Sequence, residues 1–420
     1  PLFMKRISER IHYVGVNDEA TALFEGLWPL PYGVSYNAYL VADEKVALID
    51  TVEEPWREEF VGKIREAIGD RAVDYLIVNH MEPDHSSSIA SVLELYPEIT
   101  IVASARAVPM LGGYYGIPAS RIKVVGDGEK ISLGQTELTF YMTPMVHWPE
   151  TMVTWCEDEK TLFSGDAFGT FGVPGLKATK HEESETVCED PNAITDCGLN
   201  DLGIYRDEMT RYYSNIVGKY GVPVQTALKK LAGLKIERIC STHGPVWEKF
   251  VGDVVGLYDK LSRYEAEPGV CIAYGTMYGN TEKAAKALSE ELTALGIPNA
   301  LHDLRSENAS YAIRDTFRYN TLVVGSPTYN GGIFPPVEAF MRAVAARGVK
   351  NRRFFAFGSY TWAAASVRQL LEQATALGFV PIILPEGTVN AQTGGLTFPQ
   401  AFSTQKFDVK ALAEALKNSL

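Results

Sequence analysis

The chain has 420 residues, too many for one typical domain, and its 46% apolar and 22% charged content is that of a globular protein with buried cores. A net charge of −13 argues against a surface for nucleic acids or anionic membranes, and no apolar run approaches the ~20 residues of a membrane helix. The five cysteines are scattered without a Cys-x-x-Cys pair, and the first residues lack a signal-peptide core. We therefore expect a cytoplasmic protein whose electron donor, if built on cysteine-bound iron, is a separate molecule.

The first part of the chain reads as short strands followed by alternating helices and strands. Consecutive apolar segments at 11–16, 36–41 and 46–50 predict antiparallel pairing. An amphipathic helix over 54–68 precedes an apolar strand over 75–79. Further helices are predicted over 86–95, 105–115, 205–220, 224–234 and 247–264, and further strands over 99–103, 122–125, 138–142, 152–156 and 161–164. This order predicts a sheet-on-sheet core flanked by helices for a domain of residues 1–264.

The strand over 75–79 ends in a cluster of four candidate metal ligands: His80, Glu82, Asp84 and His85. Pro83 among them favours a tight loop, and the carboxyl ends of strands are where open α/β folds place their chemistry. Two imidazoles and two carboxylates suit iron, manganese or zinc, and suit a pair of ions better than one. The alternative is that His80 and His85 are ordinary polar loop residues. That interpretation would be favoured for a single histidine, but not for a His-x-Glu-x-Asp-His pattern directly after an apolar strand.

Three later strand ends each carry one more candidate ligand. His147 follows the strand over 138–142, Asp166 follows the strand over 161–164, and His243 lies between an apolar run and a Gly-Pro turn. Such repeated placement is what convergence on one site requires. The other histidines do not follow strands in this way, and we interpret them as structural or solvated: His12, His181 and His302.

A second α/β domain is predicted over 265–420, after a short linker at 265–269. An apolar strand over 270–274 leads through a loop of small and hydroxyl residues into a helix that ends near residue 295. Such a loop can hold a phosphate on backbone N–H groups, and the lack of a Walker lysine or Gly-x-Gly-x-x-Gly disfavours a nucleoside triphosphate or dinucleotide. Alternating segments at 320–325, 337–346, 353–358, 364–377 and 381–384 predict a doubly wound parallel sheet.

Two further loops of this domain combine an aromatic residue with small polar residues, which suits a planar isoalloxazine ring. With the first loop they resemble a flavodoxin that binds FMN, although each loop alone is a common pattern. We expect Thr276, Asn280 and Thr281 to contact the phosphate more readily than Tyr278, because Tyr278 stands where many flavodoxins have a small hydroxyl residue. The predicted FMN contacts are Thr276, Met277, Tyr278, Gly279, Asn280, Thr281, Ser326, Pro327, Thr328, Tyr329, Asn330, Gly331, Gly332, Gly358, Ser359, Tyr360, Thr361 and Trp362.

The N-terminal ligand pattern resembles the metallo-β-lactamase fold, an αββα sandwich, over about residues 5–260. The hydrolases of that superfamily carry His-x-His-x-Asp-His, whereas this chain has Glu82 at the second position. A carboxylate there adds negative charge and favours iron over zinc. The substitution is similar to the flavodiiron proteins (A-type flavoproteins), as are the surrounding words Val78-Asn-His-Met-Glu-Pro-Asp-His85, His147-Trp-Pro149 and Ser35-Tyr-Asn-Ala-Tyr39. With the flavodoxin-like half, this resemblance covers nearly the whole chain.

The resemblance implies one non-haem iron at His80, Glu82 and His147, a second at Asp84, His85 and His243, and Asp166 as the bridge. It implies reduction of dioxygen to water, of nitric oxide to nitrous oxide, or both, with electrons from FMN. It also implies a donor such as rubredoxin or a flavin reductase, with a deazaflavin as a further option. The family's head-to-tail homodimer, or a dimer of dimers, is the expected assembly.

Two other functions fit parts of the pattern, namely a zinc metallohydrolase with the same ligands and a flavodoxin-type electron carrier with a vestigial metal site. Several nearby residues keep two interpretations each. Many relatives of this type carry a histidine near the Glu25 position, so hydrogen bonding around the metals differs there. The segment 166–205 is a solvated loop or a lid that uses Phe168, Phe171 or His181. The aromatic residues Trp28, Tyr32, Tyr36 and Trp148 either contact substrate or flavin or only fill space.

Overall fold

The computed structural model describes residues 5–176 and 193–420, so His181 lies outside the described residues. The chain forms two compact units. The first contains the described residues up to Tyr212 together with Val222–Asp259, and the second contains Tyr213–Gly221 together with Lys260–Leu420. The boundary between residues 264 and 265 stays a prediction. No helix within the described ranges is both long and apolar enough to cross a membrane.

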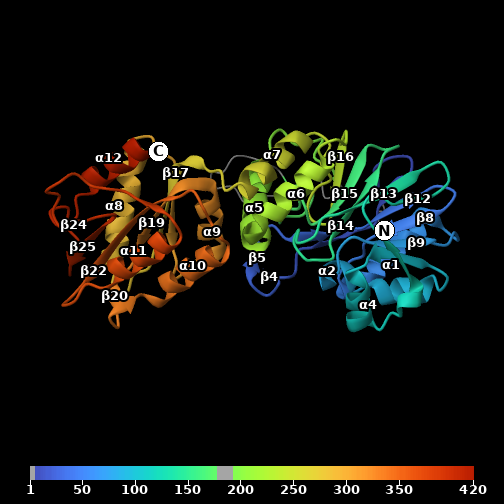
Figure 1. Cartoon of the computed structure of the whole chain (residues 1–420), viewed down its shortest axis with the longest axis horizontal. Coiled ribbons are helices and arrows are strands. Elements are labelled where there is room, and N and C mark those ends of the chain that lie inside the picture. The colour runs from blue at the N-terminus through green and yellow to red at the C-terminus, as the bar shows by residue number, and fades with distance from the viewer. Residues whose placement is uncertain (1–4, 177–192) are drawn as a thin grey trace. The chain divides into compact units, whose positions relative to one another are not determined.

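Two sheets form the centre of the first unit (Figure 1). One has the order β1-β2-β7-β8-β9-β10-β11, antiparallel up to β8 and parallel from β8 to β11. The other has the order β12-β13-β14-β15-β16, with only β15 and β16 parallel. The strands are β1 (Lys5–Arg6), β2 (Ile11–Tyr13), β7 (Tyr39–Ala42), β8 (Val46–Ile49), β9 (Tyr75–Val78), β10 (Thr100–Ser104), β11 (Ile122–Val125), β12 (Lys130–Ser132), β13 (Glu137–Met142), β14 (Met152–Cys156), β15 (Thr161–Gly165) and β16 (Arg238–Ser241).

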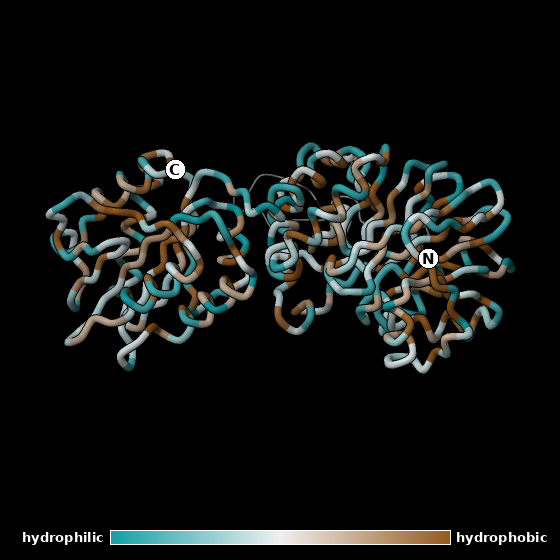
Figure 2. Tube along the Cα trace, in the orientation of Figure 1, coloured by the Kyte–Doolittle hydropathy of each residue, from teal (hydrophilic) through white to brown (hydrophobic). Residues whose placement is uncertain are grey.

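The core of this unit lies between the two sheets. Ile49 and Ile77 of the first sheet pack with Phe140 and Phe163 of the second in one buried cluster, and Figure 2 shows hydrophobic residues along these central strands. Helix α1 covers an outer face with Phe60 and other apolar residues spaced three to four apart. The helices are α1 (Arg57–Ile68), α2 (Pro83–Ser86), α3 (Ile89–Leu95), α4 (Ala107–Tyr115), α5 (Gly203–Tyr212), α6 (Gly221–Leu231) and α7 (Val251–Ser262). The predicted αββα sandwich is confirmed.

Two short antiparallel strand pairs, the second a hairpin that lies between the strands of the first in the chain, complete the first unit at the end that carries the candidate ligands. In one, β3 (Val16–Asp18) pairs with β6 (Val34–Tyr36). In the other, β4 (Leu23–Phe24) pairs with β5 (Trp28–Pro29). The Asp18 carboxylate holds the start of this hairpin, because it accepts hydrogen bonds from the backbone N–H groups of Ala20 and Thr21, each at 2.9 Å.

The second unit is a doubly wound sheet with the order β18-β17-β19-β22-β25-β24, in which the first five strands are parallel and β24 is an antiparallel edge strand. Numbered along the chain, the five parallel strands have the order 2-1-3-4-5 of flavodoxin-like folds, so the predicted class is confirmed. The strands are β17 (Glu267–Tyr274), β18 (Asn299–Asp303), β19 (Tyr319–Gly325), β22 (Arg353–Tyr360) and β25 (Gly395–Pro399), with short strands β20 (Thr328–Tyr329), β21 (Gly332–Ile333), β23 (Val380–Pro381) and β24 (Ala391–Gln392).

Helices cover both faces of this sheet (Figure 1). Ile272 of β17 belongs to a buried cluster with Leu288 and Leu412 from two helices on one face. Its neighbour Cys271 points to the other face and contacts the carbonyl of Ala312 at 3.7 Å. The helices are α8 (Asn280–Ala294), α9 (Ala309–Arg318), α10 (Pro335–Ala346), α11 (Ser366–Ala376) and α12 (Val409–Ser419).

Several predicted elements differ from the structure. The strands predicted over 11–16 and 36–41 are each divided between two sheets, into β2 and β3 and into β6 and β7. The helix predicted over 247–264 begins only at Val251, because Trp247 pairs with Ile239 and the Asp196 carboxylate accepts N–H groups of residues 248–250. The helix predicted over 205–220 is α5 followed by a π-helical turn, Tyr213–Val217. The strand predicted over 381–384 is reduced to Val380–Pro381.

His302 in β18 is the centre of a buried ion-pair network. Its Nδ1 lies 2.8 Å from Glu307 Oε1 and its Nε2 lies 2.7 Å from Asp315 Oδ2. The Arg314 guanidinium also contacts Asp315, at 2.9 Å. Burial alone lowers the pKa of His302, but the two carboxylates outweigh burial and raise this pKa to about 9. His302 therefore has a structural role, the first of the two alternatives, structural or solvated, that the sequence left open.

This network makes the stability of the second unit depend on pH. Because the pKa of His302 is about 9 when folded and 6.5 as its ordinary value, its contribution is complete below pH 6.5 and is lost as the pH rises through 9. The loss amounts to at most about 3 kcal/mol. Calorimetric melting between pH 6 and 10 should show this decline in the wild type and a smaller one in His302→Gln. Equal pH profiles for the two proteins would contradict the assignment.

Candidate metal centre

The candidate ligands begin where β9 ends, and this end is held from both sheets, by Asp50 after β8 and by Thr154 of β14. The Asn79 backbone N–H donates to Asp50 Oδ1 at 2.9 Å, and its side-chain oxygen accepts from Thr154 Oγ1 at 2.9 Å. Pro83 then opens the short helix α2, where its missing N–H costs no hydrogen bond. The turn separates His80 and Glu82, before the helix, from Asp84 and His85, within it.

The first group of converging side chains is His80, Glu82, His147 and Asp166. Glu82 Oε2 lies 3.3 Å from His80 Nε2 and 3.0 Å from His147 Nε2. Asp166 Oδ2 lies 3.2 Å and 3.1 Å from the same two nitrogens. All four side chains are buried or nearly so, with Glu82 13% exposed. Two imidazole nitrogens and two carboxylate oxygens thus face a common point.

The second group consists of Asp84, His85 and His243. The two Nε2 atoms of His85 and His243 are 3.0 Å apart, and Asp84 Oδ2 lies 3.2 Å and 3.3 Å from them. Asp166 reaches this group with its other oxygen, since Oδ1 lies 3.0 Å from His85 Nε2. One carboxylate therefore faces both groups, one oxygen to each. The seven side chains that the sequence singled out all come together, in the division that the resemblance implied.

The charges of this cluster are unbalanced. Burial, together with the Glu82 and Asp166 carboxylates, raises the pKa of Asp84 to about 8. Burial also acts to raise the pKa of Glu82, but hydrogen bonds from His147 and His80 outweigh it and lower this pKa to about 2. Both Asp84 oxygens and Asp166 Oδ2 are buried without a hydrogen bond within the described chain. Buried carboxylate oxygens without donors fit metal cations, and this donor set suits two borderline ions.

The histidine tautomers also fit ligation. His243 Nδ1 lies 2.8 Å from the Ser35 carbonyl oxygen, so Nδ1 carries the proton and the Nε2 lone pair faces the second group. His80 Nδ1 lies 2.7 Å from Glu150 Oε1, which also accepts from the Met81 N–H at 2.7 Å. The sequence prediction missed Glu150. Its only signal was its place three residues after His147 in the same strand-end loop.

An aromatic wall covers His243. The ring centroids of Phe24, Tyr212 and Tyr36 lie 5.3, 5.5 and 6.1 Å from its imidazole. Of these three rings, only Tyr36 was a candidate from the sequence. The wall keeps water from this side of the second group.

Other candidates from the sequence pack near the cluster or lie at its edge. Trp148 stacks edge-on with His80 at 5.2 Å. Phe168 and Phe171 are buried, Phe168 against Tyr258 and Phe171 against Phe24 and Tyr212. The part of this segment over residues 166–176 is therefore packed and is not the solvated loop that the sequence offered as one alternative. Glu25 lies on the surface in the turn between β4 and β5, and desolvation together with the Glu82 carboxylate raises its pKa to about 7. Trp28 and Tyr32 are partly buried.

A hollow in the second unit gathers the three predicted cofactor loops at the carboxyl ends of β17, β19 and β22, where the strand order reverses. Gln400 also lines it and was not predicted. The predicted residues that line it are Thr276, Met277, Tyr278, Asn280, Thr281, Pro327, Thr328, Ser359, Tyr360 and Thr361. Other predicted residues lie outside its lining: Gly279, Ser326, Tyr329, Asn330, Gly331, Gly332, Gly358 and Trp362.

The hollow suits a flat ring with a phosphate. Helix α8 begins at Asn280 directly after Gly279, whose φ of 90° is left-handed, so backbone N–H groups at the helix N-terminus face the loop. Thr281 Oγ1 and Ser359 Oγ lie 3.0 Å apart within the lining. Tyr278 and Trp362 are 90% and 89% exposed on the flanking loops, as aromatic rings available for stacking are.

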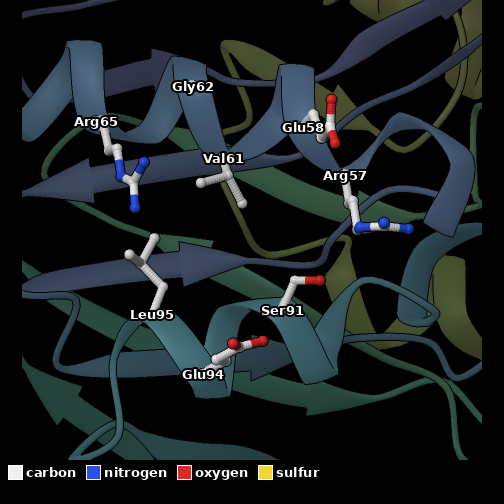
Figure 3. A pocket seen from close by; sticks show the side chains of 8 residues that line it. All are labelled: Arg57, Glu58, Val61, Gly62, Arg65, Ser91, Glu94 and Leu95. Atoms are coloured by element: carbon white, nitrogen blue, oxygen red, sulfur yellow. The ribbon is translucent and has the colours of Figure 1, made fainter.

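A second hollow, of about 490 Å³, lies between α1 and α3 and contains none of the predicted site residues. Figure 3 shows Val61 and Leu95 facing one another across it. Guanidinium and carboxylate groups occur together in its walls, so charge favours no ligand class there. Its lining residues are Arg57, Glu58, Val61, Gly62, Arg65, Ser91, Glu94 and Leu95.

Comparison with known proteins agrees with both units. Residues 34–244 match the family model of the ODP family beta lactamase, and residues 272–404 match that of flavodoxin. A nitric oxide reductase from Moorella thermoacetica is 32% identical over 386 residues, which cover 91% of this chain and 92% of the relative.

Solved structures share the whole architecture. The rubredoxin oxygen:oxidoreductase from Desulfovibrio gigas is 28% identical and superimposes with a TM-score of 0.86 over 99% of both chains. A flavodiiron protein from Giardia intestinalis also has a TM-score of 0.86, over 100% of this chain and 97% of that one. At 24% identity this second likeness shows the fold alone.

If the Asp166 carboxylate faces two cations, removal of its charge should weaken the binding of both cations. Asp166→Asn keeps an oxygen for Thr242 Oγ1, which lies 2.7 Å from Asp166 Oδ1, but removes the negative charge. We expect the metal-stripped wild type to bind two equivalents of Zn²⁺, and the variant to bind both at least about 100-fold more weakly. Competition with a chelator measures this, with the exposed Asp158→Asn as the matched control. Loss of a single equivalent in Asp166→Asn would contradict a shared carboxylate.

Proposed function

Because this chain belongs to the flavodiiron protein family, we propose that it reduces dioxygen to water, nitric oxide to nitrous oxide, or both, at a pair of iron ions supplied with electrons by FMN. The observation that carries the proposal is the Asp166 carboxylate, whose Oδ2 lies 3.2 Å from His80 Nε2 while Oδ1 lies 3.0 Å from His85 Nε2. A carboxylate so placed can bridge two ions.

The proposed ligands divide equally between the two ions. His80, Glu82 and His147 would hold one, Asp84, His85 and His243 the other, and Asp166 both. Three terminal ligands and a shared carboxylate are fewer than iron accepts, so each ion would keep room for substrate. The bound iron pair and reduced FMN together supply four electrons and a Lewis-acidic template for a diatomic molecule.

The protein's own residues then have definite tasks. Glu150 and the Ser35 carbonyl fix the orientation of His80 and His243, because each accepts the Nδ1 proton of its histidine. The wall of Phe24, Tyr36 and Tyr212 keeps water away from the second group, which strengthens electrostatic interactions inside it. In the second unit, the N-terminus of α8 would hold the FMN phosphate, and Tyr278 and Trp362 would stack on the flavin ring.

The electron donor would be a separate protein, such as rubredoxin or a flavin reductase, or a deazaflavin. Cys156, Cys197, Cys240 and Cys271 are free thiols, which suits a reducing cytoplasm, and they form no four-cysteine iron site in the described part of the chain. The name of the Desulfovibrio relative gives rubredoxin as the donor of that protein.

We also propose a head-to-tail homodimer, or a dimer of such dimers, in which each flavin serves the irons of the partner. Closed two-fold assemblies are the commonest oligomers. Light scattering of the purified protein should give at least twice the 46.2 kDa chain mass. A fully active monomer would contradict this arrangement.

The reaction itself is tested by anaerobic reduction followed by rapid mixing with dioxygen or nitric oxide. Flavin absorbance should return to the oxidised form, with water or nitrous oxide as product. His147→Asn should keep its FMN and lose gas consumption by at least about 100-fold, because only the metal group is changed. Purified protein with two zinc ions and no iron would favour the hydrolase, and unchanged turnover in His147→Asn would favour the electron carrier.

A further inference from the structure

The two ligand groups have the same composition, two histidines and one carboxylate plus the shared Asp166, but different surroundings. In the first group, His80 Nδ1 contacts the Glu150 carboxylate at 2.7 Å. Glu150 is 1% exposed, and its second oxygen has no hydrogen-bond partner among the described residues. This carboxylate is therefore a buried charge directed at one histidine.

In the second group, no carboxylate of the described residues hydrogen-bonds a histidine Nδ1, and the buried Asp50 carboxylate acts on His85 through its charge alone. The Nδ1 of His243 donates to the backbone carbonyl of Ser35 at 2.8 Å. The Nδ1 of His85 is buried and makes no hydrogen bond within the described ranges. A carboxylate acceptor raises the basicity of a metal-ligating imidazole more than a carbonyl does, because the hydrogen bond is charge-assisted. His80 is thus a stronger metal ligand than His85 or His243.

The shared carboxylate is polarised in the same direction. Thr242 Oγ1 donates to Asp166 Oδ1 at 2.7 Å, and Oδ1 is the oxygen that faces the second group. Oδ2, which faces His80 and His147, has no such hydrogen bond in the described chain. A hydroxyl donor draws electron density from the oxygen that it contacts. Oδ1 therefore has less electron density to donate to a cation than Oδ2 has.

We propose that Glu150 and Thr242 make the two cation positions unequal, so that the position at His80, Glu82 and His147 binds a divalent cation more tightly than the position at Asp84, His85 and His243. The inference rests on the proposed function only in requiring two cations at these ligands. Glu150 is a positioning residue that acts through His80, and Thr242 acts through Asp166. The tighter position fills first, and the second cation completes the centre.

Metal titration of the FMN-loaded, metal-stripped full chain tests this. Zn²⁺ competed against a fluorescent chelator should bind the wild type in two steps that differ by at least about 10-fold. Glu150→Gln keeps an oxygen for His80 and for the Met81 N–H and removes only the charge. It should weaken the tighter step by about 10–100-fold and leave the weaker step unchanged.

Thr242→Val provides the matched change on the other side. The isosteric valine frees Asp166 Oδ1 and should tighten the weaker step while the tighter one stays as it was. His147→Asn should abolish the tighter step and His243→Asn the weaker one, which assigns each step to its position. Melting temperature and FMN content check that each variant is folded. If Glu150→Gln does not fold, the titrations of the wild type and of Thr242→Val still test the inequality of the two positions.

The outcomes separate this inference from the proposed function. Two steps of equal affinity, or a tighter step unaffected by Glu150→Gln in a folded protein, would overturn the inequality and leave the two-ion centre standing. A wild type that binds no stoichiometric Zn²⁺ would overturn the centre and the inequality with it.

Discussion

One carboxylate, Asp166, determines the geometry of the candidate centre. It follows Gly165, whose φ of 60° is left-handed and turns the chain at the end of β15. The parallel pairing of β15 with β16 sets Gly165 opposite Ser241, so Thr242 and His243 follow at the same edge. Because the strand ends of both sheets meet here, the loop after β9 can approach the same carboxylate from the other sheet.

The arrangement is costly for a protein without cations. Carboxylates and imidazoles that are buried with their lone pairs facing one another lose hydration without gaining enough donors, and an uncompensated buried charge costs several kcal/mol. The raised pKa of Asp84, about 8, and the unmatched oxygens of Asp84 and Asp166 are the signs of this cost. Cations at the proposed positions would remove it, which couples metal binding to the stability of the fold.

The sequence was informative where one residue type serves one local purpose. An apolar strand followed by a ligand marked His80, His147, Asp166 and His243, and the loop after β17 marked a phosphate site. Residues whose role depends on distant partners gave no such signal. Glu150 looks like any loop glutamate until it is buried against His80. The predicted start of α7 was wrong because the carboxylate of Asp196, more than fifty residues away, accepts the backbone N–H groups of the residues just before the helix. Gln400 reaches the second unit's hollow only because β25 pairs with β22.

The proposed function depends most on two iron ions held on either side of one aspartate. Anomalous scattering at the iron absorption edge, from crystals of the protein purified without added metal, measures this most directly. Two peaks are expected, one at the His80, Glu82 and His147 side chains and one at Asp84, His85 and His243, each in contact with a different oxygen of Asp166. A single peak, or iron bound away from Asp166, would contradict this proposal.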